Sequence, residues 1–302
     1  MQSVEHINIP AKDGAVVPVL TYNIENENKK GVVIICHGFG EHSGSYIDHA
    51  RRLWQGGYAS IVPDQRGHGV PPEGKKRWHG CIPDYKCFVD DVISVTEAIK
   101  EKMPDMPIAL FGHSMGGNIV INTLLRITPK QAESYFCAIF ESPWLELYKP
   151  LSPLMIYTIR ILNRIAPNFR QRAKLNQSDV LSDREKSKSY SKDPHYHGFM
   201  SMRMIKGITD ACSYALDNAA KLPVKSFLSY ASNELIVSQR AILDFAAKAG
   251  DMVTAKEYES NHAIYNDVCC EDYCRDLIAF LDMKLKKYAV KWVSLHRATY
   301  LS

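Results

Sequence analysis

The sequence predicts an α/β protein with a mostly parallel central sheet flanked by helices. Three observations predict this class. Short apolar segments alternate with amphipathic helical segments along most of the 302 residues. Several of the apolar segments are uninterrupted, as are strands that a parallel sheet buries on both faces. A composition of 46% hydrophobic and 23% charged residues is that of a chain with a packed core and a solvated surface.

The individual elements follow from residue type and from the period of the apolar positions. The predicted strands are His6–Pro10, Val16–Tyr22, Val32–Cys36, Tyr58–Pro63, Ile108–Phe111, Phe136–Phe140, Val224–Tyr230 and Ala255–Tyr258. The predicted helices are Tyr46–Gln55, Tyr85–Lys102, Gly117–Ile127, Gln239–Ala249 and Asp272–Lys287. Helices placed between consecutive strands are typical of crossover connections, which make neighbouring strands parallel.

The alternation stops between Trp144 and Lys221, where no clear strand is found. We expect residues 144–221 to form a helical cap, inserted after the sixth strand. The core would then consist of residues 1–143 and 222–302. The first part of the insertion is rich in Leu, Ile, Met and Tyr, whereas Gln171–Lys192 is polar and charged.

Charge and targeting features exclude several classes of protein. The net charge of +4 is too small for a dedicated nucleic-acid binder, so we expect no nucleic-acid partner. The first residues contain no apolar stretch of a secretory signal, and the apolar segment Leu145–Ile165 is interrupted by two prolines and two arginines. The eight cysteines contain no C-x-x-C pair. We therefore expect a cytoplasmic protein with reduced thiols.

The most specific motif is Gly112-His113-Ser114-Met115-Gly116, a G-x-S-x-G pattern between a predicted strand and a predicted helix. The bare pattern arises by chance in roughly one chain in ten of this length, so its flanks matter. A serine on a tight strand-to-helix turn is held above the sheet, and the helix N-terminus favours a developing oxyanion. This context predicts that Ser114 is a nucleophile.

A serine hydroxyl needs a general base and an acid that orients the base, in the chain order Ser, acid, His. His262 follows the last predicted strand and is the expected base. Glu234 follows the strand Val224–Tyr230 and is the expected acid. Four other residues stay open as alternatives for the acid or for a simple hydrogen bond to the ring: Asp210, Asp217, Asp244 and Asn233.

The tetrahedral oxyanion of acyl transfer needs two backbone N–H donors. The residue after the nucleophile, Met115, supplies one in this kind of turn. The other is expected from Phe39, because the glycines at 38 and 40 let its amide turn inward. A glycine turn without catalytic meaning is the alternative.

Three motifs together resemble the α/β-hydrolase fold, and more narrowly its monoacylglycerol lipase and lysophospholipase branch, which also contains serine aminopeptidase-like members. The motifs are His37–His42, Asp64–Gly69 and Gly112–Gly117. The chain departs from the branch at Val70-Pro71-Pro72, and it has Glu234 where the branch usually has aspartate. The resemblance implies ester hydrolysis without a cofactor and without a metal.

The cap predicts the substrate class, since its apolar residues exceed what a few helical turns need for packing. Trp144, Leu147, Leu151 and Met155 are the expected substrate-binding residues for a single acyl chain. The cap could also contact membrane lipid, with its arginines near the headgroups. The same residues could instead simply cover the sheet.

We therefore expect a serine hydrolase that cleaves a monoacylglycerol or a lysophospholipid. The composition does not decide between these two headgroups, and it does not indicate the oligomeric state. Two other classes stay open. A serine peptidase of the aminopeptidase type would need an acidic group for the substrate amine, for which Glu146 is a candidate. A non-catalytic lipid-binding relative is the other alternative.

Overall fold

The computed structural model describes residues 3–72, 78–173, 176–190 and 192–299, and their side chains except those of residues 184, 189, 190 and 291–299. A central eight-stranded sheet has the strand order β1-β2-β4-β3-β5-β6-β9-β10. Its strands are β1 (Val4–Pro10), β2 (Val16–Tyr22), β3 (Gly31–Cys36), β4 (Tyr58–Pro63), β5 (Ile108–His113), β6 (Tyr135–Glu141), β9 (Ser226–Ala231) and β10 (Val253–Tyr258). The pairs β1–β2 and β2–β4 are antiparallel, and all pairs from β4 to β10 are parallel. The predicted mostly parallel sheet is confirmed.

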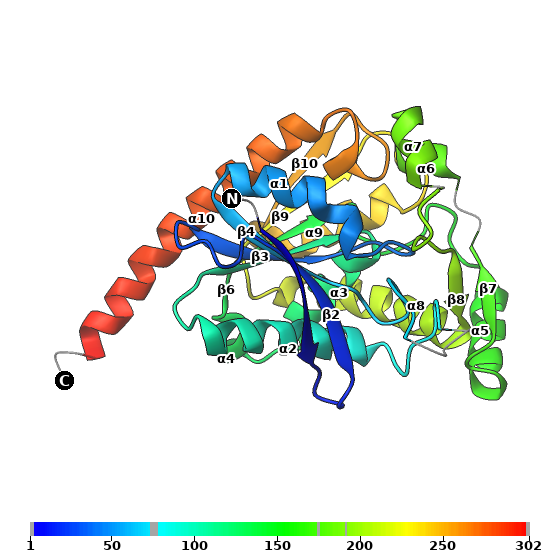
Figure 1. Ribbon diagram of the computed structural model, residues 1–302. Coiled ribbons are helices and arrows are strands. Elements are labelled where there is room, and N and C mark those ends of the chain that lie inside the picture. The colour runs from blue at the N-terminus through cyan, green and yellow to red at the C-terminus, as the bar shows by residue number, and fades with distance from the viewer. Residues whose placement is uncertain (1–2, 73–77, 174–175, 191, 300–302) are drawn as a thin grey trace.

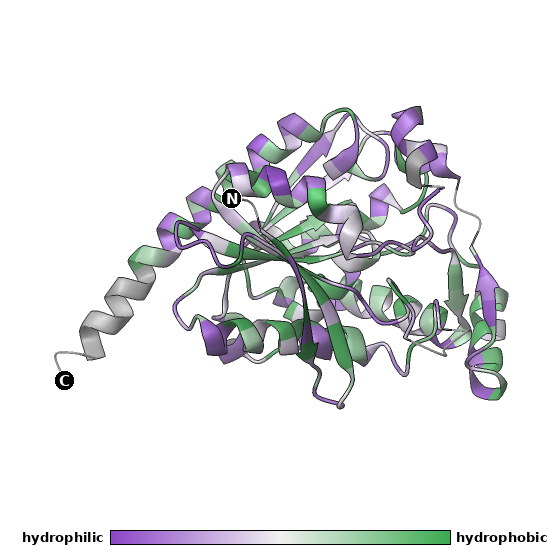
Figure 2. Cartoon of the chain, viewed as in Figure 1, coloured by the Kyte–Doolittle hydropathy of each residue, from purple (hydrophilic) through white to green (hydrophobic). Residues whose placement is uncertain are grey.

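Strand β3 shows why the apolar runs are uninterrupted. Val32 and Ile34 pack into the core on one face of the sheet, while Val33 and Ile35 pack into the core on the other. Because side chains alternate along a strand and both faces are covered, every position must be apolar. The strands are accordingly hydrophobic in Figure 2, and the helices around them also carry hydrophilic residues.

Helices cover both faces of the sheet. Those of the core are α1 (Ile47–Gln55), α2 (Lys86–Lys102), α3 (Met115–Arg126), α4 (Pro129–Ala132), α9 (Gln239–Ala249) and α10 (Cys270–Thr299). Leu53 of α1 and Leu277 of α10 join the core on one face, whereas α2, α3 and α9 contribute to the core on the other. Figure 1 shows α1 and α10 on one side of the strands and α2 and α3 on the opposite side.

The insertion between β6 and β9, residues 144–221, is called the cap below. It contains α5 (Pro153–Ile165), β7 (Arg170–Arg172), α6 (Gln177–Val180), α7 (Arg184–Tyr190), β8 (Phe199–Ser201) and α8 (Met202–Asn218). The expectation of a cap without strands is wrong, because β7 and β8 pair as an antiparallel ribbon. Three-residue strands are too short to show an alternating pattern, and their pairing joins distant parts of the chain.

Helix boundaries also differ from the prediction, most clearly at the start of α3 and at the end of α10. Helix α3 begins at Met115 instead of Gly117, because the turn after β5 is compressed into one residue. Helix α10 continues well beyond Lys287, since no Gly or Pro ends it there. Among the described residues, every helix falls short of the length and apolar character that crossing a bilayer requires.

Candidate active site

Ser114 occupies the single-residue turn between β5 and α3. Its φ of 52° lies in the left-handed region, which non-glycine residues rarely adopt. A Cβ atom on Gly116 would lie 1.9 Å from the carbonyl oxygen of Cys36, so only glycine fits there. The turn is held by bonds from the Ser114 amide to the Glu141 carbonyl (2.9 Å) and from the Trp144 amide to the Ser114 carbonyl (2.9 Å). This strained geometry is that of a nucleophile turn.

His262 and Glu234 lie on the loops that follow β10 and β9, and both are buried. The Nδ1 atom of His262 lies 2.8 Å from Oε2 of Glu234. The other carboxylate oxygen of Glu234 accepts hydrogen bonds from the amides of Ile236 (2.9 Å) and Val237 (3.2 Å). These bonds fix the carboxylate in front of the imidazole ring.

The electrostatics of the pair suit a general base. Burial raises the pKa of Glu234, but the His262 ring and the amides of Ile236 and Val237 outweigh burial and leave this pKa below its usual value. Burial lowers the pKa of His262, but the charge and the hydrogen bond of Glu234, together with the charges of Glu141 and Glu41, outweigh burial and raise this pKa. An imidazolium formed at His262 is therefore stabilised by the anion beside it.

The alternative acids lie elsewhere. Asp210 pairs with Lys206 at 2.6 Å on α8, and Asp244 lies 3.8 Å from Arg240 on α9. Asp217 is exposed on α8. The Asn233 amide donates to the side chain of Asn261 at 2.7 Å. The structure thus brings Glu234 to the ring of His262 and gives these four residues other surroundings.

The loop that carries His262 is organised by Asp267, a residue that the sequence reasoning missed. Its carboxylate accepts bonds from the Ser182 amide (3.1 Å) and hydroxyl (2.5 Å), the Ser260 hydroxyl (3.0 Å) and the Asn261 amide (2.9 Å). Burial raises the pKa of Asp267, but the Ser182 hydroxyl and these amides hold it below its usual value. Asp267 therefore ties the cap at Ser182 to the segment just before His262.

We predict that Asp267→Asn lowers kcat by roughly 10- to 100-fold, because an amide N–H₂ facing the Asn261 or Ser182 amide would displace the His262 loop. Steady-state kinetics on a short-chain ester, below the melting temperature of the variant, would measure the loss. Asp179→Asn is the matched control, since that side chain bonds only within its own short segment among the described residues. A normal kcat for Asp267→Asn would contradict a role in placing His262.

The loop His37–His42 lies beside Ser114. The Glu41 carboxylate accepts the Gly38 amide (2.7 Å), the Tyr46 hydroxyl (2.7 Å) and the Tyr265 hydroxyl (3.2 Å). These bonds fix the loop on both sides of Phe39. The amides of Phe39 and Met115 donate no hydrogen bond to the part of the chain that the structure describes. Both N–H groups can therefore donate to an oxyanion, as the predicted oxyanion site requires.

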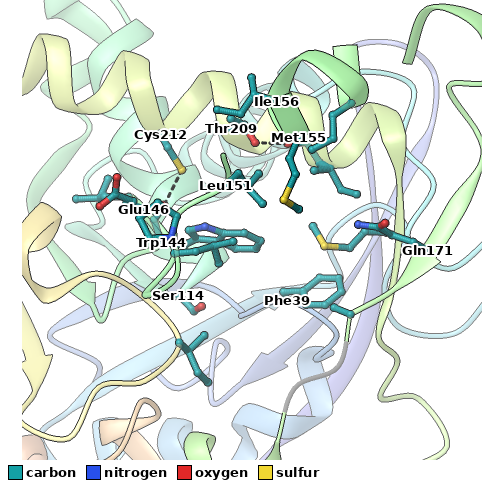
Figure 3. Close-up of a pocket in the computed structure, with 18 of the residues that line it drawn as sticks. Phe39, Ser114, Trp144, Glu146, Leu151, Met155, Ile156, Gln171, Thr209 and Cys212 are labelled. Carbon is teal, nitrogen blue, oxygen red and sulfur yellow. Dashed lines mark hydrogen bonds between the residues drawn. The ribbon is translucent and has the colours of Figure 1, made fainter. Parts of the chain in front are cut away.

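A cavity of about 710 Å³ separates the cap from the core, and Ser114 and His262 line one end of it. All four residues predicted to bind substrate, Trp144, Leu147, Leu151 and Met155, line the cavity. Figure 3 shows Ser114 at the lower end, Trp144 and Phe39 beside it, and Met155 and Ile156 above. The lining is mostly apolar, as a site for an acyl chain requires.

Sequence reasoning missed the lining contributed by α8. Besides Ser213, its cavity-lining residues are Met202, Ile205, Thr209, Cys212 and Leu216. The spacing of three and four between these five residues places them on one helix face, which is the signal that could have identified them. Among the described residues, no group of three His, Cys, Asp or Glu side chains is placed to hold a metal ion.

The sheet order, the Ser114 turn after β5 and the cap after β6 define the fold of the α/β-hydrolases. Over residues 27–268 the chain matches the family described as serine aminopeptidase, S33, and it belongs to this family. It is 30% identical over 168 residues to the monoacylglycerol lipase of Mycolicibacterium smegmatis, covering 56% of this chain and 57% of that protein. It is 30% identical over 167 residues to the monoglyceride lipase of Mus musculus, covering 55% and 52%. The chain thus matches little more than half the length of these curated relatives.

Solved structures agree with the fold. A soluble variant of monoglyceride lipase from Saccharomyces cerevisiae superposes with a TM-score of 0.80 at 22% identity, covering 94% of this chain and 96% of that one. A carboxyl esterase from Bacillus coagulans superposes with a TM-score of 0.77 at 18% identity, covering 94% and 100%. The predicted family resemblance is confirmed.

Proposed function

We propose that this protein is a serine hydrolase that cleaves the carboxylic ester of a single-acyl-chain lipid through an acyl-enzyme at Ser114. The observation that carries the proposal is the large apolar cavity under the cap, lined at one end by both Ser114 and His262, whose ring bonds Glu234. The lipase relatives and the ester hydrolases of the same fold support the reaction class.

In the proposed mechanism His262 removes the Ser114 proton while the hydroxyl oxygen attacks the ester carbonyl. The amides of Phe39 and Met115 stabilise the oxyanion, and Glu234 holds the imidazolium. His262 then protonates the leaving alcohol. Water, activated by the same imidazole, releases the fatty acid from Ser114.

The charges around the cavity favour a neutral headgroup. None of the described residues that line it is Lys or Arg, and its carboxylates are Glu41 and Glu146. A lysophospholipid would bring a phosphodiester anion that finds no cationic partner in this lining, which disfavours its burial. We therefore propose a monoacylglycerol as the substrate.

Mass spectrometry of products from a mixed lipid extract tests both parts of the proposal. We expect loss of monoacylglycerol and release of fatty acid with wild type, and neither change with Ser114→Ala. Preferential loss of lysophospholipid would overturn the headgroup proposal alone. Failure to hydrolyse any lipid or any p-nitrophenyl ester would overturn the hydrolase proposal.

Glu146 favours a second candidate function, an aminopeptidase, because its carboxylate lines the cavity and could hold a substrate amine. The mostly apolar lining makes this the weaker candidate. Hydrolysis of aminoacyl p-nitroanilides faster than of p-nitrophenyl esters would favour the peptidase.

We also propose that the cap contacts membrane lipid. Helix α5 has no buried residue, and apolar side chains at its end and just beyond it face solvent, with Ile165 72% and Phe169 58% exposed. Arg160 and Arg164 lie on the same helix. An apolar, basic surface of this kind binds at the interface of anionic bilayers.

We predict that Ile165→Ser combined with Phe169→Ser weakens binding to anionic phospholipid vesicles by roughly 10-fold or more, because burying each side chain in lipid contributes about 1.5–3 kcal/mol. Vesicle co-sedimentation measures the effect. The matched control is Val16→Ser combined with Val70→Ser, whose side chains are 58% and 63% exposed outside the cap. Equal loss in both double variants would contradict a specific role of the cap.

A further inference from the structure

Glu141 is a buried carboxyl group that the proposed mechanism does not use. It is the last residue of β6, it is fully buried, and it lies opposite His113 of β5 in the sheet. Its Oε1 atom lies 3.2 Å from Nδ1 of His113. Its carboxyl oxygens have no hydrogen bond of regular geometry among the described residues. A buried carboxyl in this situation is costly and calls for a reason.

The position of Glu141 suggests the reason. His113 packs its ring against the ring of His262, with the ring centroids 4.9 Å apart. The backbone carbonyl of Glu141 also accepts the Ser114 amide. Two histidine–glutamate pairs, His113–Glu141 and His262–Glu234, therefore lie side by side at the end of the sheet that carries Ser114.

We propose that Glu141 is a positioning residue of this active site, which holds the ring of His113 and acts through it on His262. The inference rests on the proposed hydrolase function for its catalytic consequence. Its structural part, a protonated carboxyl beside a neutral imidazole, stands independently of that function.

The pKa directions of the pair agree with this state. Burial raises the pKa of Glu141 to about 8, although the charge of His262 and the nearby amides of Tyr265 and Ile264 act against the rise. Burial lowers the pKa of His113 to about 4, partly opposed by the carboxylates of Glu41 and Glu234. At neutral pH a protonated Glu141 can then donate its O–H to Nδ1 of His113.

The groups facing Glu141 from α10 and the loop before it stay uncharged. Burial and the charge of Glu141 raise the pKa of Tyr273 well above its usual value. Burial raises the pKa of Cys274 to about 12 and that of Cys269 to about 11, with Glu141 adding to both. The titratable neighbours that remain are Glu41, Glu234 and the histidines already named.

A catalytic consequence follows from the charge of Glu141. When its proton passes to bulk water above about pH 8, a second anion lies near His262. Such an anion stabilises the imidazolium that forms as Ser114 loses its proton, and its charge acts in the same direction as that of Glu234. We expect kcat/KM of the wild type to show an additional rise in this range.

Glu141→Gln tests the inference, because the amide has the size of the protonated acid and never ionises. We expect the ratio of kcat/KM for wild type to that for Glu141→Gln to rise roughly fivefold between about pH 6 and about pH 9.5. The control is Glu257→Gln, which removes an exposed carboxylate on β10 and should give a constant ratio. A constant ratio for Glu141→Gln as well, in an active wild-type enzyme, would overturn the inference and leave the hydrolase proposal intact.

Two further measurements do not depend on turnover. A folded state that retains the Glu141 proton binds more protons than the unfolded state between about pH 4.5 and 8, so the wild type loses stability as pH rises. The melting temperature of Glu141→Gln relative to wild type should therefore increase across this range. In the wild type alone, the infrared band of a protonated carboxyl should vanish as the pH passes about 8. Absence of this band at neutral pH would overturn the inference even if Glu141→Gln does not fold.

Discussion

Ser114→Ala is expected to lower kcat for ester hydrolysis by roughly 10⁵- to 10⁶-fold, because no other group can form the acyl-enzyme. The residual rate would come from the oxyanion donors and substrate binding. The fold should be unaffected, since the change removes one hydroxyl and keeps the Cβ atom that the left-handed turn already accommodates. Wild type and variant should therefore melt at similar temperatures.

Covalent labelling distinguishes loss of chemistry from loss of binding in this variant. A fluorophosphonate should add its mass to wild type at Ser114 and should leave Ser114→Ala unlabelled, while both proteins bind a non-hydrolysable ether analogue of a monoacylglycerol. Ser114→Thr keeps a hydroxyl but adds a methyl group in a tight turn, and it should remain strongly impaired. Labelling of another serine, with activity retained in Ser114→Ala, would show that the nucleophile is elsewhere.

The fold could be predicted from sequence where local patterns determine it. The apolar run Val32–Cys36 must be a strand buried on both faces, and the order of such runs and helices leaves few sheet topologies. The ribbon of β7 and β8 could not be predicted, because it depends on contacts between segments about thirty residues apart. A three-residue segment is too short for its β-propensity to identify it as a strand.

The candidate site, like the fold, could be predicted from the sequence only in part. Ser114, His262 and Glu234 could be proposed because each follows a predicted strand and their order in the chain is the one expected after a G-x-S-x-G turn. Asp267 and Glu141 could not, since their importance depends on which side chains the fold brings to them. Asp267 matters because Ser182 of the cap reaches it, and Glu141 because β6 pairs with β5 in a register that sets it opposite His113.

Glu234→Gln is expected to lower kcat by roughly 10³- to 10⁴-fold with little change in KM, because Glu234 bonds His262 without lining the cavity. The amide is neutral, so the imidazolium loses its stabilising anion. If the amide nitrogen faces Nδ1 of His262, the ring also adopts the tautomer that cannot accept the Ser114 proton. Both effects act on the chemical step.

The pH profile separates these effects from a general loss of structure. Burial alone would lower the pKa of His262, and the charge and hydrogen bond of Glu234 make the largest contribution to reversing this direction. Removing this charge should therefore shift the acidic limb of kcat/KM for Glu234→Gln toward lower pH, which misfolding would not do. Asp210→Asn and Asp217→Asn are matched controls, since both replace carboxylates on α8 that do not line the cavity. Normal activity in Glu234→Gln together with an inactive Asp210→Asn or Asp217→Asn would show that the acid of the triad is a residue of α8 and not Glu234.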